Sequence, residues 1–163
     1  MKYKPLLCMA MLLTVLIFPA SASMVSFLVV EAGLNEGAPT TQYGTIWEDG
    51  LMSSFFEAGL IVTNSPILRV SEKPEATLTG AARVDFYEAV QGGAEYFILC
   101  IIGYEFQGRR MVPVEITIKT YRTDTQERLF EQRFPVGRGR SRGEEIRNAQ
   151  TAGRIVISQI RGQ

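Results

Sequence analysis

Few residues of this chain have side chains suited to catalysis. Its 163 residues include no histidine, so the most common general base and the most common metal ligand are both missing. A serine nucleophile would then need a lysine as its base, and after residue 22 the only lysines are Lys73 and Lys119. Lys73 falls in a predicted loop and Lys119 on a predicted solvent-facing strand position, so serine hydrolase chemistry is not expected.

Metal and carboxylate chemistry find little support either. Zinc would lack histidine and paired cysteines, and Cys100 lies in an apolar segment, where a small core residue is expected. Oxygen ligands could come from Glu48 and Asp49, or from Asp85 and Glu88, which share a helix face at a spacing of three. A solvated helix surface is the simpler interpretation, so no metal and no cofactor are predicted. A carboxylate pair for sugar hydrolysis stays open, because the separation that matters there is spatial.

The most unusual segment is 137–143, which reads G-R-G-R-S-R-G and places three arginines at alternate positions. It precedes a predicted helix start, where backbone amides and guanidinium groups can converge on an anion. The candidate binding residues are therefore Arg138, Arg140, Ser141 and Arg142, with a solvated loop as the alternative. A nucleotide P-loop is not supported, because no G-x-x-x-x-G-K-[ST] motif occurs.

Residues 1–22 have the three parts of a secretory signal peptide. Lys2 and Lys4 give a positive start, residues 6–18 form an apolar run, and residues 20–22 are a small-residue cleavage pattern. A helix over the apolar run would rise about 20 Å, less than the roughly 30 Å hydrocarbon core of a membrane. We predict a cleaved signal over 1–22 and one periplasmic or secreted domain over 23–163 without a transmembrane segment. An uncleaved membrane anchor is the alternative.

Charge is unevenly distributed along the predicted domain. Residues 122–163 hold nine arginines and five acidic residues, a net charge of +4, whereas residues 23–121 hold six basic and twelve acidic residues, a net charge of −6. This segregation suits an anionic polymer as partner, or head-to-tail self-association. Nucleic acid is not expected as a partner, because the exported domain is slightly acidic overall.

The first half of the domain has the pattern of a strand–helix–strand unit. Residues 25–30 (V-S-F-L-V-V) are short and almost entirely apolar, which predicts a buried strand. Residues 43–58 place Trp47, Leu51 and Phe55 on one helical face, and the next strand is expected directly after Gly59. Such a unit favours a right-handed crossover between parallel strands.

The second half predicts a weaker helix, three strands and a final helix. The weaker helix follows Pro74 and ends at Gly92, and a strand over 96–102 is apolar on both faces, as in the centre of a sheet. A strand over 112–121 alternates apolar and polar residues and is joined by a turn to a partner over 128–134. Ser141 and Glu144 form a candidate capping box for the last helix, whose apolar face contains Gly153.

The element order is strand, helix, strand, helix, strand, strand, strand, helix. We therefore predict a single α/β sandwich with a mixed sheet of about five strands and three helices, packed mainly on one side of the sheet.

The V-x-F-L-V-V strand and the segment F-F-E-A-G-L-I-V over 55–62 resemble the small bacterial envelope domains related to the TolB amino-terminal domain and CsgG. In that group a helix that ends near a glycine leads into the second strand. The resemblance covers most of 25–160. It implies a non-catalytic module for assembly, secretion or enzyme activation, and carries over no catalytic residue.

The sequence thus favours an exported, non-enzymatic interaction or assembly domain of the cell envelope that binds a protein or an anionic polymer through the arginine-rich loop. The alternative is a small carboxylate-dependent hydrolase of wall or sugar polymers. A third hypothesis is a subunit of a larger envelope machine in which oppositely charged regions of neighbouring copies meet.

Overall fold

The structure is a computed structural model and describes residues 22–34, 41–71, 80–108, 110–137 and 141–162. The predicted signal peptide lies outside the described residues except for Ala22. No helix within the described ranges is both long enough and apolar enough to cross a membrane.

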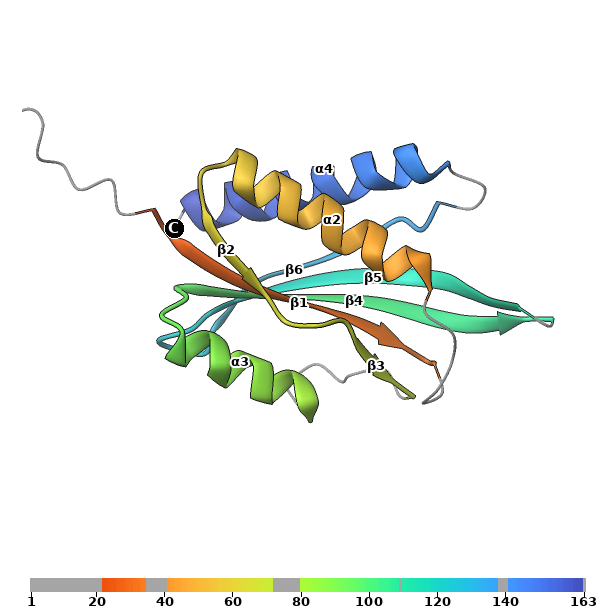
Figure 1. The fold of residues 1–163 in the computed structure, drawn as a ribbon, viewed down its shortest axis with the longest axis horizontal. Helices are drawn as coiled ribbons and strands as arrows, with labels where there is room; N and C mark the ends of the chain where they lie inside the picture. Colours follow the sequence, from red (N-terminus) through yellow and green to blue (C-terminus); the bar gives the residue numbers. More distant parts are fainter. Residues whose placement is uncertain (1–21, 35–40, 72–79, 109, 138–140, 163) are drawn as a thin grey trace, which may run out of the picture.

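One mixed sheet forms the centre of the fold (Figure 1). Its strand order is β2-β1-β4-β5-β6, so β2 and β6 are the two edges, and a short strand, β3, pairs with the far end of β1. β1 runs parallel to β2, β3 and β4, whereas β4, β5 and β6 are antiparallel neighbours. The strands span Met24–Ala32 (β1), Ile61–Asn64 (β2), Leu68–Val70 (β3), Tyr96–Gln107 (β4), Arg110–Arg122 (β5) and Arg128–Phe134 (β6).

Three helices cover the two faces of this sheet. Helices α2 (Gln42–Glu57) and α4 (Arg142–Arg161) lie side by side on one face, and α3 (Ala81–Gln91) lies on the other (Figure 1). The predicted α/β class, the mixed sheet and the unequal distribution of helices are confirmed. The element order differs by one strand, β3, which the predicted order does not contain. Three residues beside Pro66 are too few to show a strand period, and only pairing with β1 defines them.

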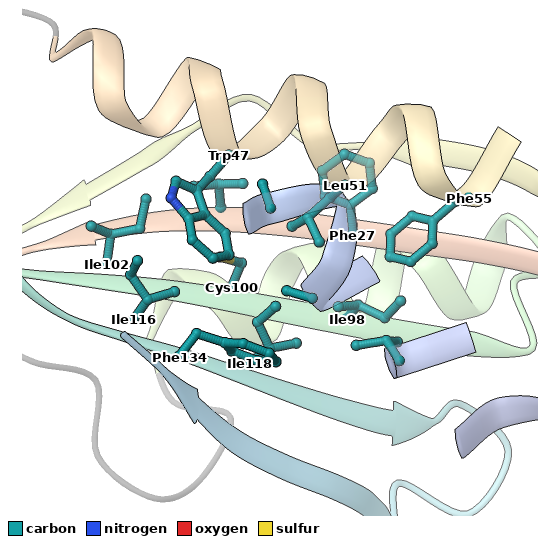
Figure 2. Packing of buried hydrophobic residues seen from close by; sticks show 14 of the residues in the cluster. Phe27, Trp47, Leu51, Phe55, Ile98, Cys100, Ile102, Ile116, Ile118 and Phe134 are labelled. Carbon is teal, nitrogen blue, oxygen red and sulfur yellow. The ribbon is translucent and has the colours of Figure 1, made fainter. Parts of the chain in front are cut away.

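The alternation of side chains along β1 divides the core in two. Phe27 and Val29 point to the layer of α2 and α4, whereas Leu28 and Val30 point to α3. Figure 2 shows the larger cluster, in which Trp47 and the other apolar side chains of α2 pack over β1, β4 and β5. The predicted helical face of α2 is therefore a core face, as the spacing indicated.

Helices α2 and α4 approach closely because both carry small residues where they cross. A Cβ atom built on Gly50 would lie 2.5 Å from the Cβ of Ala149, and one built on Gly153 would lie 1.8 Å from Ser54 Oγ. Gly153, which weakens the helix prediction by its low propensity, is thus explained by this contact.

The expectation that Lys119 faces solvent is wrong. Its side chain is 5% exposed, because β5 is an interior strand and Lys119 lies between Leu99 of β4 and Glu131 of β6 in the register. The alternation of β5 identified the two faces of the strand correctly. It could not show that the polar face is covered as well.

Candidate functional site

The structure describes residue 137 and residues 141–143 of the predicted anion-binding loop. Arg138 and Arg140 lie outside the described residues, whereas Ser141 is the N-cap of α4 and Arg142 is its first residue. Ser141 Oγ accepts a hydrogen bond from Glu144 N at 3.3 Å, and Glu144 Oε2 accepts one from Ser141 N at 2.7 Å. The predicted capping box is therefore confirmed.

Residues 139–143 read G-R-S-R-G and so have the G-x-S-x-G spacing of a hydrolase nucleophile elbow. In such an elbow the serine hydroxyl is activated by a histidine, which this chain does not contain. The Ser141 hydroxyl instead contacts Glu144, as part of the helix cap. The serine of this G-x-S-x-G segment is therefore the N-cap residue of α4 and not a nucleophile.

The basic surface continues along α4 beyond this loop. Arg147, Arg154 and Arg161 are spaced by seven residues, so they lie on one helix face at intervals of about 10 Å. All three are exposed, and no carboxylate of the described residues forms an ion pair with them. Arg161 also donates a hydrogen bond to the carbonyl oxygen of Ala58 at 2.6 Å, which joins the ends of α2 and α4. Arg147 and Arg154 are therefore the arginines of this row best able to bind an external anion.

Glu31, the carboxylate of β1, is fully buried, although nothing in the sequence pattern indicates this. Tyr104 OH donates to its Oε1 at 2.9 Å, Arg69 Nε donates to its Oε2 at 3.0 Å, and the Thr41 hydroxyl also donates to Oε1. These partners come from β4, β3 and the N-cap of α2, so one carboxylate joins three elements at the carboxyl end of β1. Burial raises the pKa of Tyr104, which keeps its hydroxyl protonated as a donor. Both oxygens of Glu31 are thus used within the fold and have no access to a substrate.

A second buried carboxylate, Glu145, joins α2 to α4. Its Oε1 accepts hydrogen bonds from Tyr43 OH at 2.6 Å and from Trp47 Nε1 at 3.0 Å. The side chain is 3% exposed although it lies in the first turn of its helix. The sequence contains one sign that Glu145 could be buried: it is a charged residue placed between the capping box and the apolar face of α4. Glu145 therefore holds the N-terminal halves of the two helices together.

Cys100 is also a core residue, as predicted. It is fully buried, and burial raises the pKa of its thiol far above the ordinary range, so the nucleophilic thiolate does not form. Figure 2 shows it beneath Trp47 among apolar side chains.

The acidic pair of α3 lines a surface hollow of about 230 Å³ between α3 and β2. Asp85 and Glu88 stand one turn apart on the same helix, so they are not opposed across a cleft as sugar hydrolysis requires. The rest of the hollow is lined by the polar residues Ser26, Thr63, Asn64 and Ser65 and by Met24, Ala89 and Gly92. Glu48 lies on the other side of β2, where it accepts a hydrogen bond from Asn64 at 2.7 Å.

Within the described ranges, no group of three or more histidine, cysteine or acidic residues could hold a metal ion.

Comparison with known proteins places the fold among solved structures. A family model described as "Uncharacterised protein" matches residues 27–131. A structure of the PelC dodecamer from Paraburkholderia phytofirmans matches with a TM-score of 0.50 and 11% identity, over 80% of this chain and 84% of that chain. No curated protein matches the sequence.

Two further structures match less closely. Lipoprotein GNA1162 from Neisseria meningitidis has a TM-score of 0.43 and 15% identity, over 87% of this chain and 99% of that chain. TolB from Acinetobacter baumannii has a TM-score of 0.39 and 17% identity, over 85% of this chain and 27% of that chain. The chain thus has the fold of PelC, and TolB, whose amino-terminal domain the sequence resembles, is among the structures that match.

Proposed function

We propose that this chain, which belongs to the family described as an uncharacterised protein, is an exported, non-enzymatic binding and assembly domain of the bacterial cell envelope. The signal peptide that the sequence predicts over 1–22 supports the location. The observation that carries the proposal is the contrast between the acids and the arginines. Glu31 and Glu145 are used inside the fold, whereas the arginines of α4 face outward without carboxylate partners among the described residues.

An anionic polymer is the partner that suits this surface. Arg142, Arg147 and Arg154 are exposed residues of one helix, and Arg138 and Arg140 precede them in the sequence. Exposed guanidinium groups bind carboxylate or phosphate groups by charge-assisted hydrogen bonds. A row of them binds a repeating anion through several contacts at once, and the affinity then falls as salt is added. The proposed binding surface is Arg138, Arg140, Ser141, Arg142, Arg147 and Arg154.

Binding to immobilised polygalacturonate, a polycarboxylate, tests this proposal, with neutral dextran as the control polymer. Replacement of Arg138, Arg140 and Arg142 by serine is expected to weaken binding, and the added changes Arg147→Ser and Arg154→Ser to abolish it. Arg83→Ser is the matched control, because Arg83 is exposed on α3 across the sheet. Binding that resists salt, or that is unchanged in the fully substituted variant with its fold intact, would contradict the proposal.

Self-association is a second proposed property. It is supported by the shared fold with PelC, which was crystallised as a dodecamer, and by the opposite charges of 23–121 and 122–163. Head-to-tail contacts between unlike surfaces form rings or filaments, and a ring leaves no surface unused. Sedimentation equilibrium at low and high salt tests this property. We expect a defined assembly that dissociates as salt increases, whereas a monomer at every concentration would exclude it.

A further inference from the structure

The hollow between β2 and α3 lies at one edge of the sheet and carries unneutralised negative charge. Asp85 is half-buried and Glu88 exposed, and neither side-chain carboxylate forms an ion pair or hydrogen bond with any described residue. Both carboxylates face the polar end of β2, which pairs only with β1 among the described strands. This edge of the sheet is therefore acidic and has open backbone groups.

A buried hydroxyl in the hollow indicates that the site accepts a polar group. Ser26 is 5% exposed and lines the hollow, on the face of β1 that carries Leu28 and Val30 toward α3. No side-chain hydrogen bond within the described part of the chain involves its hydroxyl, which is open to water in the hollow. An incoming donor that fills the hollow would replace water at this hydroxyl.

The size and chemistry of the hollow suit a single cationic side chain. Its volume of about 230 Å³ is below the roughly 300–1,000 Å³ of small-molecule pockets. A guanidinium group has five N–H donors, enough to reach both carboxylates and a hydroxyl oxygen at the same time. Arginine is therefore a better match for the hollow than a compact ammonium ion.

The opposite edge of the same sheet presents such an arginine. Arg133 of β6 has a side chain that is 78% exposed and contacts only Glu115, at 3.2 Å, among the described carboxylates. Exposed ion pairs of this kind contribute little, so the contact is easily exchanged. Arg133 pairs with Thr117, and its neighbour Phe134 enters the core under α2 and α4, so Arg133 points to the α3 side of the sheet. The arginine and the hollow thus lie on one face, at opposite edges.

We infer that the β2–α3 hollow binds the Arg133 guanidinium of a second copy of this chain, so that the β6 edge of one copy meets the β2 edge of the next. The inference rests on the self-association proposed above and names its interface. Because the two surfaces differ, every copy can use both edges at once, and the contact repeats around a closed ring. The contact would pair two of the twelve acidic residues of 23–121 with one of the nine arginines of 122–163.

Charge exchange between the two edges tests the inference. We expect Glu88→Arg and Arg133→Glu, made singly, each to weaken association of the exported protein by roughly tenfold or more in sedimentation equilibrium. The double variant with both changes is expected to associate about as well as the natural chain, because the pair is restored with reversed charge. Asp49→Arg is the matched control, since Asp49 is exposed on the outer side of α2.

The neutral variants Glu88→Gln and Arg133→Gln keep the test informative if a reversed charge disturbs folding. They should weaken association by less than the reversals, with unchanged thermal unfolding. If the natural chain associates and both single variants associate equally well, this interface is wrong and the proposed self-association still holds. A natural chain that stays monomeric would overturn both.

Discussion

Gly153 of α4 lies directly against Ser54 of α2, so closely that a Cβ at position 153 would be 1.8 Å from Ser54 Oγ and 2.9 Å from Ser54 Cβ. This contact sets the distance between the two helices that carry Glu145, Trp47 and the arginine row. The orientation of the proposed binding surface thus depends on the absence of a Cβ atom at Gly153.

Gly153→Ala is therefore expected to destabilise the protein, although alanine favours a helix by about 1 kcal/mol over glycine. The added methyl must push the helices apart, and overpacking of this kind costs about 1–3 kcal/mol. Urea unfolding measures the difference. Gly143→Ala is the control, because the nearest atom to its Cβ would be Arg147 Nη1 at 3.9 Å. Adding Ser54→Gly should recover part of the loss, and a Gly153→Ala variant that is more stable than the natural chain would contradict this account.

Ser141→Ala should destabilise the start of α4. The change removes the side-chain acceptor for Glu144 N and leaves the first turn without its cap. Loss of an N-cap serine costs about 1 kcal/mol. Chemical unfolding with circular dichroism is the measurement, and Ser141→Asp, which can still cap the helix, should retain most of the stability. Equal losses from both replacements would mean that capping is not what Ser141 provides.

Arg69→Met should destabilise the protein by roughly 3 kcal/mol, because it leaves the buried Glu31 carboxylate without its cation. The side chain of Arg69 is 27% exposed, whereas that of Glu31 is fully buried, so water cannot replace the lost contact at the carboxylate. Arg83→Met, on the exposed surface of α3, should change stability by much less. The same replacement in a Glu31→Gln background should cost less than in the natural chain, since the buried charge is then absent. Additive losses would show that the two residues act independently.

Alkaline pH should lower stability partly through Cys100. Burial raises the pKa of its thiol in the folded state, whereas in the unfolded chain the thiol ionises near its ordinary value of about 8.5. Above that pH the unfolded state releases a proton that the folded state retains, so the free energy of unfolding falls by about 1.4 kcal/mol per pH unit for this group. Cys100→Val should remove this slope between about pH 9 and 10, as measured by urea unfolding at each pH. An identical slope in the variant would assign the pH dependence to other groups.

Local patterns predicted most of the elements because each depends on neighbours in the sequence. Trp47, Leu51 and Phe55 define the buried face of α2 by their spacing, and Ser141 with Glu144 defines the start of α4. The change of register between Gly103 and Tyr104 in the β4–β5 pair also falls at a glycine, a residue that often marks a bulge within a strand. Such signals act over a few residues, so the sequence contains them in full.

The candidate site was less predictable because its contacts join distant segments. Glu31 meets Arg69 and Tyr104, which are 38 and 73 residues away, and nothing in the strand pattern of β1 indicates that its single charged residue is buried. Asp85 and Glu88 could be paired on one helix face from the sequence, but their position beside Ser26 depends on how α3 crosses the sheet.

The sequence by itself determined the fold class, the capping of α4, the absence of an imidazole and the separation of charge along the chain, because composition and short-range periodicity are properties of the linear polymer. The tertiary structure alone decided that Lys119 is covered, that the acids Glu31 and Glu145 are used as internal ties, and that the acidic hollow and Arg133 stand at opposite edges of one sheet. Strand order and helix crossing bring residues together regardless of their distance in the chain, and it is these long-range contacts that define the proposed surfaces.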